Sequence, residues 1–210
     1  CGQQMKRDAA TKLAEWVEAG GTVLATAAAG TRDHLNRPLK TLMPVFGVKA
    51  TEWQQEGGPN RPMFETRRAK PVGKVTLTGT LPRPELKVFY IQEKLVPADG
   101  AEVVGAFEDG GPAALINRYG KGMVLRLAAL PGVAYMHRPL NSDYYNEDKK
   151  CTYLMRDFDP MMKDLIVWPA RQAAARPVGE CDLPLVELTR WNGKRHAVLF
   201  VIDHGLEPRE

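Results

Sequence analysis

The sequence predicts an α/β fold of the doubly wound type with a β-rich second half. Three features of the 210 residues lead to this prediction. An amphipathic helical pattern near the N-terminus ends at Gly20-Gly21, an almost continuous apolar segment follows it, and several segments after residue 73 alternate between apolar and polar side chains. Helix, double glycine and buried strand make one αβ step of a doubly wound sheet, whereas alternation with period two is typical of half-exposed strands.

The first expected element is a helix with one apolar face. Residues at the helical spacing form this face: Met5, Ala9, Leu13, Trp16 and Val17. The glycine pair ends the helix. "TVLATAAAG" (residues 22–30) is typical of a strand buried on both faces of a parallel sheet. A complete unit would have another strand before the helix, so we expect the domain to be truncated at its N-terminus.

The middle of the chain is expected to pass from irregular structure to strands. "LKTLMPVFGV" (residues 39–48) predicts a short helix broken near Pro44. Residues 51–70 are rich in Gly, Pro and charge, which indicates an irregular excursion. Strands are then expected at "KVTLTG", "LKVFYIQ", "AEVVGAFED", "PAALINRYG" and "GMVLRLAAL".

The tripeptide Gly120-Lys121-Gly122 has two interpretations, a phosphate-binding loop or a turn. A phosphate-binding loop needs GxxxxGK followed by Ser or Thr at the start of a helix. Here Lys121 is followed by Gly122 and Met123, and the next residues alternate as a strand. We therefore predict a hairpin turn with positive φ at both glycines and Lys121 at an exposed tip.

The last third of the sequence predicts a loop, a helix and a hairpin. "YMHRPLNSDYYNEDKK" (residues 135–150) is polar and is expected to be an exposed loop. Asp159-Pro160 would begin a helix toward Ala175, with Pro169 as its kink or end. Residues 183–205 predict a hairpin that turns at Asn192-Gly193.

These elements suggest three parts of the chain. Residues 1–135 would form a partial α/β domain, residues 136–180 a linker loop and helix, and residues 181–210 the start of a partial β-domain. Trp16 and Trp53 are expected in the core, and Trp191, beside the predicted turn, is expected to be partly exposed.

Composition excludes several classes of partner. The net charge is +4, but the basic residues are scattered and do not interleave with aromatic residues, so no nucleic acid is expected. No apolar run approaches the roughly 20 residues that span a bilayer. Cys1, Cys151 and Cys181 show no CxxC or Cys/His spacing, so we expect neither a metal nor a cofactor. The first residue allows a lipidated mature N-terminus or a fragment; the helix that follows at once favours a fragment. The compartment stays open.

Three segments resemble a known family. "LAEWVEAGGTVLATAAAGTRDHLNRPLKTLMPVFGV" resembles the middle of the β-galactosidase trimerisation domain of family-42 glycoside hydrolases. "PAALINRYGKGMVLRLAALPG" resembles a later hairpin of that domain. "PLVELTRWNGKRHAVLFVIDHG" is similar to the small β-domain that follows it, although Asp203 precedes His204 where the family usually has asparagine. Residues 133–183 have no counterpart.

This resemblance implies a flavodoxin or class I glutamine-amidotransferase-like fold without amidotransferase chemistry. It also implies an accessory role in carbohydrate metabolism. The domain would pack beside an upstream (β/α)₈ barrel of the same chain, which carries the catalytic glutamates, and would help to assemble a homotrimer.

The candidate site is a polar loop at the carboxyl edge of the first strand, where open α/β sheets place binding sites. Its residues are Asp33, His34, Asn36 and Arg37, which would contact another subunit or a ligand such as a sugar. No catalytic residue is expected. Cys1 precedes a helix as a nucleophile would, but no histidine is followed two residues later by glutamate. A carbohydrate-binding module using Trp191 is the alternative function.

Overall fold

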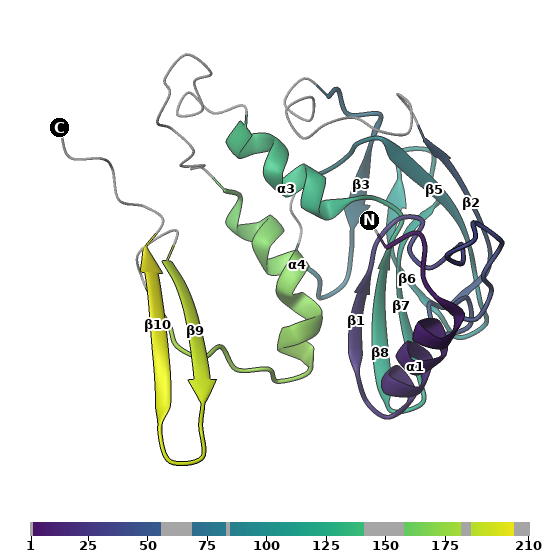
Figure 1. Cartoon of the computed structure of the whole chain (residues 1–210). Coiled ribbons are helices and arrows are strands. Elements are labelled where there is room, and N and C mark those ends of the chain that lie inside the picture. Colours follow the sequence, from purple (N-terminus) through teal and green to yellow (C-terminus); the bar gives the residue numbers. More distant parts are fainter. Residues whose placement is uncertain (1, 56–68, 83–84, 141–157, 182–185, 204–210) are drawn as a thin grey trace.

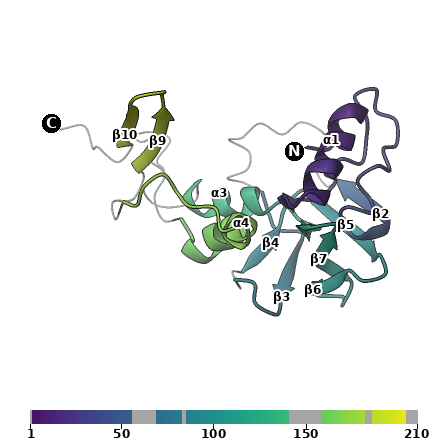
Figure 2. The ribbon, with the colours of Figure 1, turned by 90° about the horizontal axis from the view of Figure 1, so that it is seen from below.

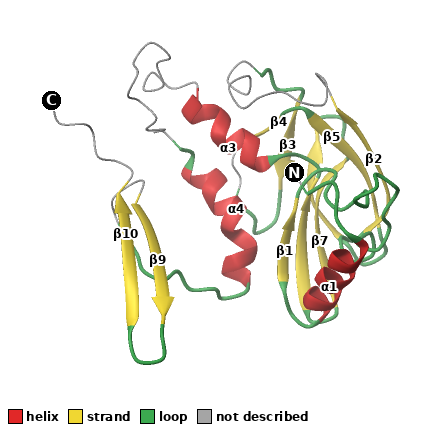
Figure 3. Ribbon diagram, viewed as in Figure 1, coloured by secondary structure: helices red, strands yellow, loops and turns green. Residues whose placement is uncertain are grey.

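The computed structural model describes residues 2–55, 69–82, 85–140, 158–181 and 186–203. These residues form a mixed α/β architecture in which a curled six-stranded sheet is accompanied by a two-stranded ribbon, three helices and a separate hairpin (Figures 1 and 3). Cys1, Cys151 and the predicted loop from residue 141 onward lie outside the described residues.

The main sheet is mostly antiparallel. Its strands follow the order β1 (Thr22–Ala25), β8 (Gly122–Leu127), β7 (Pro112–Tyr119), β6 (Glu102–Phe107), β3 (Gly73–Leu77) and β4 (Leu86–Val88). Strands β1 and β8 are parallel, and the remaining described pairs of the sheet are antiparallel. The mixed α/β class is confirmed, but the parallel sheet predicted from the sequence is confined to this one pair.

Helix α1 (Arg7–Glu18) ends in a Schellman motif, as its glycine pair predicts. The Gly21 amide donates to Trp16 O at 2.9 Å, the Gly20 amide donates to Val17 O at 2.9 Å, and Gly20 has a φ of +124°. Val17 is fully buried. The prediction that Trp16 belongs to the core is wrong, because its side chain is 53% exposed and lies over Gly21.

The segment between β1 and the next strand consists of turns. Strand β1 ends at Ala25, five residues earlier than predicted, because Ala28 adopts a positive φ of +59° and reverses the chain. The short helix expected near Pro44 is also absent. Residues 41–47 form consecutive turns instead, and Asn117 on β7 donates to the carbonyls of Pro44 and Val45 at 3.0 and 2.9 Å.

A second, two-stranded sheet joins β2 (Val48–Gln55) to β5 (Ile91–Pro97) in antiparallel register. The prediction of irregular structure is therefore wrong for residues 51–55, which belong to β2, and residues 56–68 lie outside the described residues. The single strand predicted over residues 86–92 is divided, because Tyr90 has a φ of +62° and redirects the chain from β4 into β5. Strand β5 contacts β7, so this ribbon lies beside the main sheet (Figure 2).

The hairpin between β7 and β8 is confirmed. Tyr119 pairs with Gly122 across a two-residue turn, and Lys121 is exposed at its tip. Gly120 has the predicted positive φ, +57°. The same prediction for Gly122 is wrong: its role is to admit backbone, because a Cβ there would lie 2.0 Å from Val17 O. The tip thus packs under the end of α1, where the Lys121 amide donates to Glu18 O at 2.8 Å.

Two helices follow the sheet. The prediction of an exposed loop is wrong for residues 135–140, which belong to helix α3 (Pro131–Leu140). The ring centres of His137 and Phe89 are 4.4 Å apart. Helix α4 (Pro160–Gln172) begins as predicted, with Asp159 accepting from the amides of Met161 and Met162.

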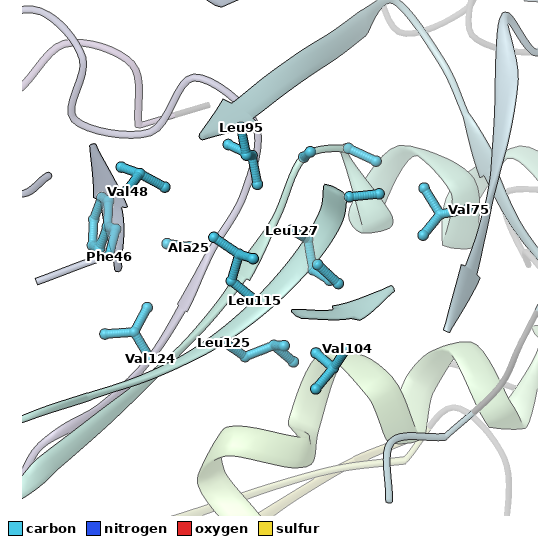
Figure 4. Close-up of a cluster of buried hydrophobic side chains, with 14 of the residues drawn as sticks. Ala25, Phe46, Val48, Val75, Leu95, Val104, Leu115, Val124, Leu125 and Leu127 are labelled. Carbon is cyan, nitrogen blue, oxygen red and sulfur yellow. The ribbon is translucent and has the colours of Figure 1, made fainter. Parts of the chain in front are cut away.

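Helix α4, which lies within the predicted linker loop and helix of residues 136–180, contributes side chains to the main core. Leu165 is fully buried, and Thr22 Oγ1 on β1 donates to Pro169 O at 3.0 Å. The core continues through the sheet, where Leu115 and Leu125 lie near Val104 (Figure 4). No helix in the described part of the chain is long and apolar enough to cross a membrane.

The predicted C-terminal hairpin is confirmed as β9 (Val186–Asn192) and β10 (Ala197–Asp203). Asn192 pairs with Ala197, so the connection is a four-residue loop that includes Gly193. The hairpin extends away from the sheet (Figures 1 and 2). Trp191 is 74% exposed, in agreement with the prediction.

Candidate functional site

The loop predicted as the site, residues 33–37, is built around one buried carboxylate. Asp33 is 1% exposed, whereas the next four residues are exposed. Its Oδ1 accepts the amides of Leu35 at 3.0 Å and Arg37 at 2.9 Å, and its Oδ2 accepts Arg7 Nη2 at 2.9 Å. Asp33 is therefore the internal anchor of the loop and does not project toward a partner.

The backbone also closes this loop at its base. The Asp33 amide donates to Arg37 O at 2.8 Å, and the Asn36 amide donates to Asp33 O at 2.9 Å. Asn36 has a φ of +60°, a conformation that asparagine tolerates better than most residues. The result is a closed loop in which His34, Leu35, Asn36 and Arg37 are exposed to solvent.

Hydrogen bonds to the charged form lower the pKa of Asp33. The Arg37 amide contributes most to this shift, burial opposes it, and the Arg7 side chain and the Leu35 amide add to it. The carboxylate is thus ionised at neutral pH and holds the loop closed. The four candidate residues are brought together, but they divide into one anchor and three exposed side chains.

A buried ion pair that was not predicted from the sequence lies against the turn after β1. Glu93 on β5 and Arg126 on β8 are 0% and 1% exposed, and Arg126 Nη2 lies 2.7 Å from Glu93 Oε1. The Glu93 carboxylate also accepts the Thr51 hydroxyl and, at 3.2 Å, the Ala28 amide. One carboxylate therefore ties together β2, β5, β8 and the turn after β1.

The surroundings of Arg126 explain how its charge is tolerated. Burial lowers the pKa of Arg126, and the charge and hydrogen bonds of Glu93 oppose this shift. Its Nη1 donates to Thr26 O, and its guanidinium lies 5.4 Å from the centre of the Phe46 ring. A sequence signal for the pair existed: alternation in β5 places Glu93 on the same buried face as Ile91 and Leu95.

A pocket of about 320 Å³ opens beside this ion pair. The turn after β1, the segment around Leu39 and Phe46, and strand β2 form its walls, and Arg126 contributes to its lining. Among the described residues, no group of three or more His, Cys, Asp or Glu side chains is arranged to hold a metal ion.

Fold and site together define an α/β domain with an ordered, exposed polar loop next to its parallel strand pair. The sequence matches the β-galactosidase trimerisation domain family over residues 3–147, and the chain belongs to this family. The match includes the whole main sheet, the candidate loop and the buried ion pair. Comparison with curated proteins gives no match.

Solved structures show the same fold. The chain is similar to a GH42 β-galactosidase from G. stearothermophilus, with a TM-score of 0.64 and 17% identity over 96% of this chain and 25% of that one. It is also similar to a β-galactosidase from Bacillus circulans sp. alkalophilus, with a TM-score of 0.62 and 16% identity over 97% and 26% of the two chains. The chain thus spans about a quarter of the length of these proteins.

Proposed function

We propose that this chain is a non-catalytic assembly domain of a β-galactosidase-like glycoside hydrolase that acts in carbohydrate metabolism. The observation that carries the proposal is the family match over residues 3–147. In the whole protein, the domain would pack beside a (β/α)₈ barrel of the same chain and join subunits as a homotrimer. Its fold would be a variant of the class I glutamine-amidotransferase or flavodoxin type, for which the parallel pair of β1 and β8 is the supporting feature.

The loop of residues 33–37 is the proposed contact with a neighbouring subunit or with its ligand. A loop that is already fixed loses little conformational freedom on binding, which favours association. The Asp33 anchor supplies this order, and His34, Asn36 and Arg37 supply exposed polar groups.

Light scattering on the full-length protein tests the assembly role. We expect a trimer, and we expect the paired change of His34 and Arg37 to alanine to weaken it without lowering the melting temperature. Lys121→Ala, an exposed change at the distant hairpin tip, is the control. A barrel-bearing monomer contradicts the assembly role alone, whereas a full-length protein without a barrel contradicts the hydrolase assignment.

Activity assays on the 210-residue chain test the non-catalytic role. We expect neither hydrolysis of nitrophenyl β-galactoside nor release of ammonia from glutamine, because the proposed catalytic glutamates belong to the barrel. Turnover that disappears in a Cys1→Ser variant would contradict this proposal and favour a cysteine amidotransferase or hydrolase.

Exposure of Trp191 favours a second candidate, a carbohydrate-binding module. An indole that is 74% exposed could stack on a neutral sugar. Retention on immobilised galactan that is lost in Trp191→Ala would support this candidate. A wild-type chain that is not retained would exclude it.

A further inference from the structure

The charged residues that line the pocket beside the buried ion pair are all positive. Of its sixteen lining residues, four are Lys or Arg (Arg32, Lys40, Lys49 and Arg126), and none is Asp or Glu. A concave surface with one sign of charge concentrates ligands of the opposite sign.

Not all of this charge is compensated by nearby carboxylates. Glu93 balances Arg126, and Asp99 lies 2.7 Å from Lys49 in an exposed pair. Arg32 donates to Asn36 O at 3.2 Å, and no carboxylate of the described residues pairs with it. Lys40 has no ion-pair partner in the described part of the chain. The described lining of the pocket therefore carries net positive charge.

A second observation concerns Arg126. Arg126 lines the pocket and is 1% exposed. Its Nε is buried and has no acceptor among the described residues. A buried N–H group without an acceptor costs free energy, commonly about 1–3 kcal/mol. This unpaired donor belongs to a residue that lines the pocket, and guanidinium groups such as that of Arg32 favour carboxylate and phosphate.

The rest of the lining suits an organic body. Phe46, Met43 and Trp53 give the pocket an apolar wall, and Trp53 is half-buried. The volume of about 320 Å³ is at the lower end for small-molecule sites. We propose that this pocket binds a small organic anion of monosaccharide size, a sugar acid or a sugar phosphate. Lys40 and Arg32 pair with its acidic group, and its ring packs on Trp53. This inference does not depend on the assembly role.

Titration of the 210-residue chain tests the proposal with three probes of similar size. Tryptophan fluorescence is followed while D-galacturonate, D-galactose 6-phosphate or neutral D-galactose is added. We expect at least one charged probe to bind about tenfold or more tightly than galactose, the change expected for one charge-assisted hydrogen bond. The stronger of the two charged probes identifies the carboxylate or the phosphate as the recognised group.

Variants locate the binding. Lys40→Ala and Arg32→Ala are each expected to weaken the charged probe by about tenfold. Lys121→Ala is the control: it removes one lysine outside the pocket and is expected to leave the affinity unchanged. In Trp53→Phe the fluorescence change should disappear while calorimetry still detects binding, and Trp191→Ala should retain the signal.

The outcomes decide the proposal. Absence of binding by both charged probes, equal binding of galactose, or unchanged affinity in Lys40→Ala and Arg32→Ala would each overturn it. If inorganic phosphate displaced the sugar phosphate fully at an equal concentration, the proposal that the pocket also recognises the sugar body would be overturned. Light scattering under the same conditions separates this result from the assembly role, since binding and oligomer mass are measured independently.

Discussion

At the scale of single residues, close packing decides which side chains the fold permits. The hairpin tip of β7 and β8 contains two glycines that both lie against the backbone of α1, and Gly120 in addition has a positive φ. Sequence alone could identify the turn, but not the close approach, because Glu18 O and Val17 O belong to a helix about a hundred residues earlier in the chain.

The hairpin tip gives the first prediction. Gly122→Ala is expected to lower the free energy of unfolding by about 2 kcal/mol or more, since its Cβ would overlap Val17 O and the backbone must move. Gly120→Ala should cost about 1 kcal/mol or more, because of its positive φ and because its Cβ would lie 2.6 Å from Glu18 O. Lys121→Ala should change stability by less than about 0.5 kcal/mol. Urea denaturation measures all three, and equal effects at Lys121 and Gly122 would contradict the structure.

The buried ion pair gives the second prediction. Arg126→Met leaves Glu93 buried without a counterion and should cost about 3–5 kcal/mol. Combining it with Glu93→Gln should recover about 1 kcal/mol or more relative to the sum of the single changes, because the uncompensated charge is gone. Lys49→Met, which breaks the exposed pair with Asp99, should cost less than about 1 kcal/mol. A double-mutant cycle by chemical denaturation measures the coupling, and additive effects would refute it.

At the scale of elements, local sequence signals worked where short-range geometry decides the structure. The Gly20-Gly21 stop, the Asp159-Pro160 start and the two hairpins depend on adjacent residues, and all were predicted. Helix α3 was not predicted because its sequence contains Gly132 and Pro139, residues that disfavour a helix interior, and because a long polar stretch follows it. The redirection at Tyr90 has no local turn signal, since a tyrosine with positive φ is set by tertiary packing.

The candidate site shows the same division. Its four residues could be located from the sequence because they follow a buried strand. The anchoring role of Asp33 was not predicted, because it depends on the folded path of the loop and in part on Arg7, a residue on another element. The Glu93–Arg126 pair joins two strands far apart in the chain, so neither residue identifies the other. Only the inward position of Glu93 in its strand gave a signal.

The Asp33 loop gives a prediction about pH. Because the pKa of Asp33 is lowered in the folded chain, its stabilisation is complete above the unfolded value of about 3.9 and is lost as pH falls through the folded pKa. Asp33→Asn should therefore destabilise the chain at pH 7 and flatten the loss of stability below about pH 4. Urea denaturation across this range measures the effect. Arg7→Gln should remove only part of it, since the backbone amides remain; an unchanged pH profile in Asp33→Asn would contradict the anchor.

At the scale of the whole molecule, the sheet with its helices and the β9–β10 hairpin differ in how much apolar surface they cover. Leu165 and Trp168 of α4 are buried against the sheet. The hairpin instead exposes a run of five consecutive apolar residues on both of its faces: Val198, Leu199, Phe200, Val201 and Ile202. A two-stranded hairpin with this composition is marginal by itself and favours association.

The last prediction concerns the form of that association. A trimer built through the 33–37 loop is closed and has a fixed mass, whereas contacts through an open hairpin edge add further chains. We therefore expect the 210-residue chain to show a light-scattering mass that grows with concentration. The double change Leu199→Lys and Val201→Lys should suppress this growth by placing charge on the apolar strand, and Thr189→Lys on the exposed partner strand is the control. A mass that stays constant over a hundredfold concentration range in the unmodified chain would contradict the role of the hairpin, and growth that persists in the double variant would assign it to another surface.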